Sequence, residues 1–363
     1  MKHINELSNI LNKYLNWNKA RIKCLAQMVQ SIITVKTINL SQVATGFCTK
    51  SKIDSSYKRI QRFLRFFEFD QMSIIKIITN IFSLSGKIIL SIDRTNWTFG
   101  KIHLNFLVLS IVFKGIAIPI FWKNLARAGG SKTEDRIKII SRILKCITCK
   151  KIKYLLADRE FIGEKWIKWL LEENIPFIIR IKSNIMVKVN KKDKLSTPIN
   201  HFFERLPNCR RKYIKKPFWI SSNKVFISAS RAPKGVLSIV ASPAFSRNTL
   251  MFYKRRWEIE TLFGCLKSKG FCLEDTHIIN SKRIEKLFFV LTIAFCWAYA
   301  AGIQREKYCP IKIKNHGRKM YNLFRYGFDV LRKAIINKNR SIKKFLILFL
   351  ETTYYGKGTY LCL

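Results

Sequence analysis

The segment YKRRWEIETLFGCLK, residues 253–267, lies in a stretch whose apolar residues recur at helical spacing, from Asn248 to about Lys269. At about 100° per residue, the apolar side chains between Ile259 and Leu266 share one face of this predicted helix. Glu258 falls beyond that face, where we expect it to be solvated. The other edge of the face carries four polar residues at regular spacing: Tyr253, Arg256, Glu260 and Lys267. A polar edge beside a buried stripe is typical of a functional site.

Two further carboxylates are expected at the ends of strands. The short apolar run Lys87–Asp93 ends in Asp93, and the run Ile152–Ala157 ends directly before Asp158. Both side chains are therefore expected to point into one crevice, together with Glu260. Three carboxylates suit a pair of Mg²⁺ ions, which prefer oxygen ligands and can assist an in-line displacement at phosphate.

The same residues also have a purely structural interpretation. Asp93 and Asp158 could be turn residues at strand ends, and Glu260 could pair with Arg256 one helical turn away. Glu160 is expected to pair with Arg159 or to cap the following helix. Each structural interpretation is reasonable singly, but the combination favours a site. In that site Arg256 and Lys267 would hold a phosphodiester, and Tyr253 would hydrogen-bond to or stack on an end nucleotide.

Three motifs carry a family resemblance, namely SIDRTNW at 91–97, ADREFIG at 157–163 and Y-x2-R-x3-E-x6-K at 253–267. In these motifs and their order the sequence resembles the DDE transposases of bacterial insertion sequences, specifically the IS-four group of the Tn-five and Tn-ten enzymes. The resemblance is strong from about residue 87 to 275. It implies that Asp93, Asp158 and Glu260 are catalytic and bind two Mg²⁺ ions, with Mn²⁺ as a substitute, and that Tyr253, Arg256 and Lys267 grip terminal phosphates.

The resemblance also implies a fold and a reaction. We expect an α/β protein with an RNase H-like mixed sheet, interrupted by a β-rich insertion and flanked by helical terminal regions. In such enzymes water nicks one strand at an element end, and the freed 3′-OH usually forms a hairpin before the ends join target DNA. Some relatives stack a flipped base on a Trp of the insertion, for which Trp219 is the candidate here. A homodimer on DNA is expected from the same source.

The chain is expected to divide into five segments, since the pattern changes from helices to strands and back. They are a helical DNA-binding region at 1–85, the first part of the core at 86–182, a β-rich insertion at 183–246, the final core helix at 247–275 and a helical region at 276–363. Within the first segment, Asn39–Ala44 and Ser55–Phe67 suggest a helix-turn-helix. A capping box is expected at Ser131 and Glu134.

The net charge of the chain indicates the class of its binding partner. The 363 residues carry 68 Lys and Arg against 22 Asp and Glu, a net charge of +46, while 48% of residues are hydrophobic. The apolar content excludes a disordered tail protein, and the excess of cations requires an anionic partner, of which nucleic acid is the first candidate. Residues 305–350, with 13 Lys and Arg and two acids, are expected to add DNA contacts.

Ten scattered cysteines and no apolar leader predict a cytoplasmic protein, and the resemblance implies a bacterial, nucleoid-associated one. Cys146 and Cys149 are interpreted as an incidental pair along a helix rather than a zinc site. Residues 287–304 lack charge over 18 positions, which reaches the length of a membrane span, but a buried helix is the favoured interpretation. A DNA-cutting and DNA-joining enzyme is therefore the leading hypothesis. The alternatives are a non-catalytic DNA-binding repressor derived from a transposase and a membrane protein built around residues 287–304.

Overall fold

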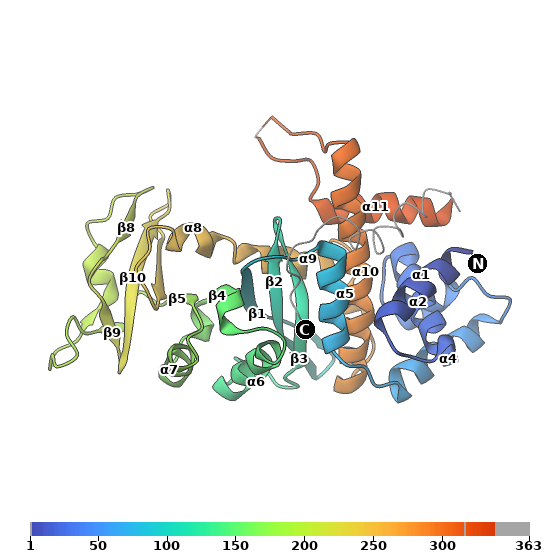
Figure 1. Ribbon diagram of the computed structural model, residues 1–363, viewed down its shortest axis with the longest axis horizontal. Helices are drawn as coiled ribbons and strands as arrows, with labels where there is room; N and C mark the ends of the chain where they lie inside the picture. The colour runs from blue at the N-terminus through green and yellow to red at the C-terminus, as the bar shows by residue number, and fades with distance from the viewer. Residues whose placement is uncertain (1, 316, 338–363) are drawn as a thin grey trace. The chain divides into compact units, whose positions relative to one another are not determined.

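The computed structural model describes residues 2–315 and 317–337, and its chain divides into two compact units (Figure 1). Unit 1 comprises the described residues within Met1–Ser85, Asn96–Asn105 and Leu262–Leu361. Unit 2 comprises those within Gly86–Thr95 and Phe106–Thr261. Each unit is described by itself.

Unit 1 is built of helices, as the apolar spacing of residues 1–85 predicts. Its helices are α1 (Lys2–Tyr14), α2 (Lys19–Val35), α3 (Leu40–Thr45), α4 (Ile53–Phe66), α5 (Met72–Phe82), α10 (Ser281–Tyr308) and α11 (Leu323–Ile336). Asparagine side chains cap the N-termini of α2, α3, α10 and α11, which satisfies backbone N–H groups that have no partner within the helix. The expected helix pair at 39–67 is present as α3 and α4.

The uncharged run 287–304 forms the middle of α10. Among the described residues, α10 is the one helix long and apolar enough to cross a membrane by length and composition. Its side chains from Leu287 to Gly302 are buried inside the protein, as in a core helix. Two glycines let the backbones of α10 and α11 touch, because a Cβ on Gly302 would meet the Leu323 carbonyl and one on Gly327 would meet the Ala298 carbonyl.

Unit 2 contains a mixed sheet, in which the strands follow the order β3-β2-β1-β4-β5-β11-β10-β8 and β9 pairs with β10. Their bounds are β1 (Ile88–Phe99), β2 (Ile102–Phe113), β3 (Ile116–Asn124), β4 (Ile152–Ala157), β5 (Phe177–Ile181), β8 (Arg211–Tyr213), β9 (Phe218–Ile220), β10 (Asn223–Arg231) and β11 (Leu237–Ser242). The far ends of β1 and β2 belong to unit 1.

The sheet is mixed, because it contains both parallel and antiparallel strand pairs. β1 lies parallel to β4 and β4 parallel to β5, whereas β2 and β3 are antiparallel to each other. Helices α6 (Thr133–Leu144) and α7 (Glu164–Glu172) connect the parallel strands, and they bury Ile140 and Trp166. An antiparallel trio followed by two parallel strands is the expected RNase H-like mixed α/β core.

The predicted insertion extends the same sheet. β11 pairs antiparallel with β5, and β10 pairs with β11 and with β8, so the hydrogen-bonded ladder continues from the core without a gap. The insertion also holds the short pair β6 (Met186–Val187) and β7 (Thr197–Pro198). A cluster of buried side chains spans this continuous sheet: Ile89, Val112, Leu156, Ile178, Val240 and Leu250.

The predicted helix at 248–269 is in fact two helices, α8 (Thr249–Lys254) and α9 (Trp257–Leu266). Between them the backbone makes i→i−3 bonds, for example from Arg256 N–H to the Tyr253 carbonyl at 2.9 Å. Such tight turns advance about 120° per residue instead of 100°. The prediction of one continuous helix is therefore wrong, although three residues at about 120° still bring Arg256 back to the edge of Tyr253.

Three smaller expectations also differ. Asp93 lies inside β1 rather than at its end, because the strand continues to Phe99. The cap of α6 comes from Asp135, whose carboxylate accepts the Lys132 N–H at 3.3 Å, and not from Glu134. Cys146 and Cys149 do not share a helix, since Cys146 follows α6 and Cys149 begins the short 3₁₀ turn Cys149–Lys151.

Candidate active site

Two neighbouring parallel strands bring Asp93 and Asp158 together. Ile92 on β1 lies opposite Ala157 on β4, so the two aspartates follow at the next position of each strand. Asp158 leaves β4 and begins the 3₁₀ turn Arg159–Phe161. The crevice geometry predicted for these two carboxylates is thus present, although only Asp158 lies at a strand end.

Arg256 joins Asp93 to Glu260. Its Nη1 lies 3.3 Å from Asp93 Oδ2, and its Nη2 lies 2.6 Å from Glu260 Oε1. The Arg256 side chain is only 6% exposed, and its buried Nε has no hydrogen-bond partner among the described residues. The helical pair Arg256–Glu260 of the structural interpretation is therefore real, but the same guanidinium also reaches a second carboxylate.

Tyr253 connects the third carboxylate to this network. Its hydroxyl donates to Asp158 Oδ1 at 3.4 Å, and Arg180 Nη1 lies 3.8 Å from the same oxygen. The guanidinium carbon of Arg256 lies 5.9 Å from the Tyr253 ring centroid. Asp93, Asp158, Glu260, Tyr253 and Arg256 thus form one polar network within unit 2.

Burial decides the protonation of this network. Removal from water raises the pKa of Asp93 to about 6, although the Arg94 N–H and the Arg256 guanidinium oppose that rise. Asp93 is therefore mostly ionised at neutral pH. Burial alone would lower the pKa of Arg256, but Tyr253 and the surrounding carboxylates raise it, so its charge is secure. Burial also raises the pKa of Tyr253, which keeps its hydroxyl a hydrogen-bond donor.

Lys267 belongs to unit 1, unlike the other predicted site residues. Its Nζ lies 2.7 Å from Glu274 Oε1 and donates to the carbonyl of Asn96 at 3.1 Å. It follows the last residue of α9, where its N–H bonds to the Phe263 carbonyl. Both contacts lie within unit 1.

Sequence reasoning missed the clamp that holds the turn after Asp158. Arg94 donates to both carboxylate oxygens of Glu160 at 2.6 Å, and to the Gly129 carbonyl at 2.6 Å. From the other side, buried Arg136 donates to the Glu160 carbonyl at 3.0 Å and lies 4.9 Å from the Phe161 ring centroid. The prediction that Glu160 pairs with Arg159 is wrong, because Arg94 offers a two-pronged geometry from the next strand. The repeat of Asp-Arg after both apolar runs was the available signal.

Glu258 is not solvated as predicted. Its side chain is 13% exposed and lies 3.0 Å from the Arg255 Nε, while the backbone N–H groups of Gly115 and Phe113 also contact it. The tight turn before α9 rotates Glu258 inward, and burial raises its pKa.

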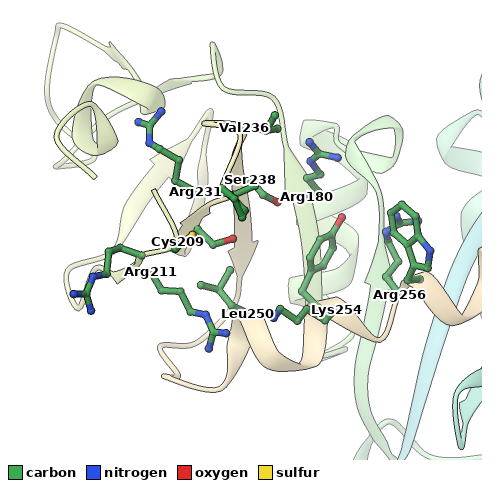
Figure 2. A pocket seen from close by; sticks show the side chains of 15 residues that line it. Arg180, Cys209, Arg211, Arg231, Val236, Ser238, Leu250, Lys254 and Arg256 are labelled. Atoms are coloured by element: carbon green, nitrogen blue, oxygen red, sulfur yellow. The ribbon is translucent and has the colours of Figure 1, made fainter. Parts of the chain in front are cut away.

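A cavity of about 660 Å³ opens beside this network in unit 2 (Figure 2). Strands β5, β8, β10 and β11 and helices α8 and α9 border it. Its charged lining is entirely cationic: Arg180, Arg210, Arg211, Arg231, Lys254 and Arg256. Tyr253 and the 65% exposed Trp257 supply aromatic surface. Trp219, the predicted stacking residue, does not line the cavity; Lys191 lies over its ring at 5.5 Å.

Oxygen ligands are available here for a metal, but they do not yet surround one point. Among the described residues, no three His, Cys, Asp or Glu side chains are close enough to hold one ion. The reason is visible in the network, where the Arg256 guanidinium stands between Asp93 and Glu260. The donor chemistry fits Mg²⁺, since all three side chains are carboxylates.

Comparison with known proteins finds a similarity over part of the chain. Residues 123–297 match the transposase DDE domain. The DDE match covers slightly less than half of the chain; it begins after Asp93 and includes Asp158, Tyr253, Arg256, Glu260 and Lys267. It supports a DDE transposase. No curated protein matches the sequence. A cryo-EM structure of the piggyBac transposase synaptic complex with hairpin DNA is similar at 12% identity and a TM-score of 0.45, covering 95% of this chain and 81% of that one.

Proposed function

We propose that this protein is a DNA transposase of the IS-four group that cuts an insertion sequence at its ends and joins it to target DNA. One observation carries the proposal: Asp93, Asp158 and Glu260 are linked into a single network by Arg256 and Tyr253. These five are among the six residues that the family motifs select, Lys267 being the sixth, and four of the five lie inside the range that matches the transposase DDE domain.

Asp93, Asp158 and Glu260 would hold two Mg²⁺ ions, with Mn²⁺ able to substitute. When bound, the ions lower the pKa of water and stabilise charge on the attacking and leaving oxygens. Binding requires Arg256 to give up Asp93 or Glu260, since an ion and a guanidinium compete for the same oxygens.

The guanidinium of Arg256, once released from a carboxylate, would bind DNA phosphates. The Nε of Arg256 is buried without a hydrogen-bond partner among the described residues, and a phosphate would match the planar donors of the guanidinium once it is released. Tyr253 would donate its hydroxyl to a neighbouring phosphate oxygen, and Lys267 is the third residue that the family motif assigns to terminal phosphates. The cationic cavity with Trp257 at its border suits an unpaired nucleotide, whose phosphate seeks the arginines and whose base stacks.

Three further expectations belong to this proposal. Two protomers would hold two ends, which implies a homodimer on DNA. The protein would act in the bacterial cytoplasm, at the nucleoid. If the protein follows the usual route of the family it resembles, the cut ends would pass through a hairpin.

The test is cleavage of an end-labelled duplex that carries the element's terminal repeat, resolved on a denaturing gel. We expect strand nicking with Mg²⁺ and none with EDTA, and a hairpin band if that route is used. Specific binding without cleavage in either Mg²⁺ or Mn²⁺ would contradict the proposal and favour a repressor derived from a transposase.

The clamp of Arg94 on Glu160 gives a second prediction. Breaking it frees the turn that begins at Asp158, so we expect Arg94→Ala and Glu160→Gln each to slow single-turnover nicking about 10- to 100-fold, as loss of outer-shell partners does elsewhere. DNA affinity should not change, because neither residue lines the cavity.

A double-mutant cycle separates this clamp from two unrelated defects. The double variant should be no slower than either single variant, because both substitutions remove the same ion pair. Additive decreases in rate would reject the clamp as the cause. A thermal unfolding curve for each variant reports any general loss of structure.

A further inference from the structure

The connection between α10 and α11 forms an exposed arm in unit 1, residues 309–315 and 317–322. It is the orange loop at the top of Figure 1. Its base is fixed, because Tyr326 donates to the Cys309 carbonyl at 2.9 Å and the Asn322 side chain caps α11. Of the described arm residues from Lys312 onward, every one is exposed. The arm therefore offers surface rather than packing.

Backbone bonds make this arm a two-stranded ribbon. Ile313 pairs with Lys319 in an antiparallel bridge. Lys314 N–H donates to the Arg318 carbonyl at 2.9 Å, and Met320 N–H donates to the Lys312 carbonyl at 2.8 Å. The ribbon turns at Gly317, whose φ of 76° is open to glycine.

The pairing sorts the side chains onto two faces, because residues opposite each other point the same way and neighbours alternate. One face, here called the cationic face, consists of Lys312, Lys314, Arg318 and Met320. The other carries Ile313 and Lys319, and there Lys319 pairs with Glu306. The cationic face contains no acidic residue, and Lys312 and Lys314 form no ion pair with any described residue.

We propose that the cationic face binds duplex DNA. A two-stranded ribbon fits the major groove, which is about 12 Å wide, and its cations would face the phosphates that border the groove. The 43% exposed Met320 adds apolar surface for base edges. This inference rests on the proposed function for its substrate, and it assigns to unit 1 a DNA-binding surface outside the cavity and carboxylates of unit 2.

The test measures binding and needs no catalysis. Fluorescence anisotropy of a labelled 30-base-pair duplex with the full-length protein, in EDTA and across a salt series, gives the salt slope of binding. Neutralising Lys312, Lys314 and Arg318 to Gln should reduce that slope by about 2 to 3 units, at roughly 0.9 for each phosphate that the variant no longer neutralises. A variant that keeps the charge, with Lys312→Arg and Lys314→Arg, should bind as the unmodified protein does.

A matched control removes three exposed cations elsewhere, by Lys138→Gln, Lys145→Gln and Lys150→Gln in and after α6. The control should change the slope by less than about one unit, because these lysines lie outside the arm. An arm variant with the slope of the unmodified protein overturns the inference. An unchanged slope with loss of self-association in sedimentation overturns it in favour of a second copy as the partner. Failure to cut DNA would contradict the proposed function but would leave this binding result intact.

Discussion

Replacing Glu260 by Gln is expected to abolish metal-dependent nicking, with a loss of at least about a thousandfold, equivalent to ~4 kcal/mol of transition-state stabilisation. Gln keeps the size of the side chain and can still accept from Arg256, but it removes one of the three anionic ligands that the proposed Mg²⁺ ions need. Because 37% of the Glu260 side chain is exposed, the fold should survive. Single-turnover nicking and thermal unfolding measure the two effects separately.

Glu258→Gln is the control for this result, two residues earlier on the same helix. Burial raises the pKa of Glu258, so a neutral side chain is tolerated there at small cost. The variant should nick DNA at nearly the unmodified rate. Equal decreases in rate for the two variants, or nicking that survives in Glu260→Gln, would show that Glu260 is not a catalytic ligand.

Gly327→Ala is expected to destabilise unit 1 by roughly 2 to 4 kcal/mol. The added methyl group would meet the Ala298 carbonyl and the Gly302 backbone, and backbone atoms of packed helices cannot move aside as a flexible side chain can. The rise in helix propensity from Gly to Ala returns at most about 1 kcal/mol. We therefore expect a lower midpoint of thermal unfolding.

Gly264→Ala in α9 provides a control with the opposite sign. Its nearest neighbour would be the flexible side chain of Lys269 at 3.4 Å, so the propensity gain should prevail and raise the midpoint by the equivalent of ~0.5 to 1 kcal/mol. If Gly327→Ala also raised the midpoint, the close approach of α10 and α11 would have no energetic consequence.

Local periodicity was sufficient to predict most elements. The apolar run at Ile152–Ala157 is a strand with those bounds, and the helix pair expected at 39–67 is present. Such runs are decided by the burial of nearby side chains, which a sequence pattern records. The mixed sheet was expected from the family resemblance of the three motifs.

The remaining features depend on tertiary contacts. The prediction for residues 253–267 assumed one continuous helix. The turn that interrupts it is held by groups far away in the sequence, because Arg255 donates to the Val112 carbonyl and Arg256 pairs with Asp93. Charge partners were equally hidden. Arg94 and Glu160 are 66 positions apart, and only the pairing of β1 with β4 reveals that they meet.

The continuous hydrogen-bonded sheet from β1 to β8 bears on how accurately the proposed cleavage position is set. Asp158 follows β4, while Arg211 and Arg231 border the cavity from β8 and β10, and every strand between them is hydrogen-bonded to the next. A sheet of this kind resists stretching, so the interval between carboxylates and cavity is set by strand spacing of about 4.8 Å rather than by a flexible linker. If the proposed nucleotide binds in the cavity, the sheet would act as a molecular ruler that sets which phosphodiester lies at the carboxylates.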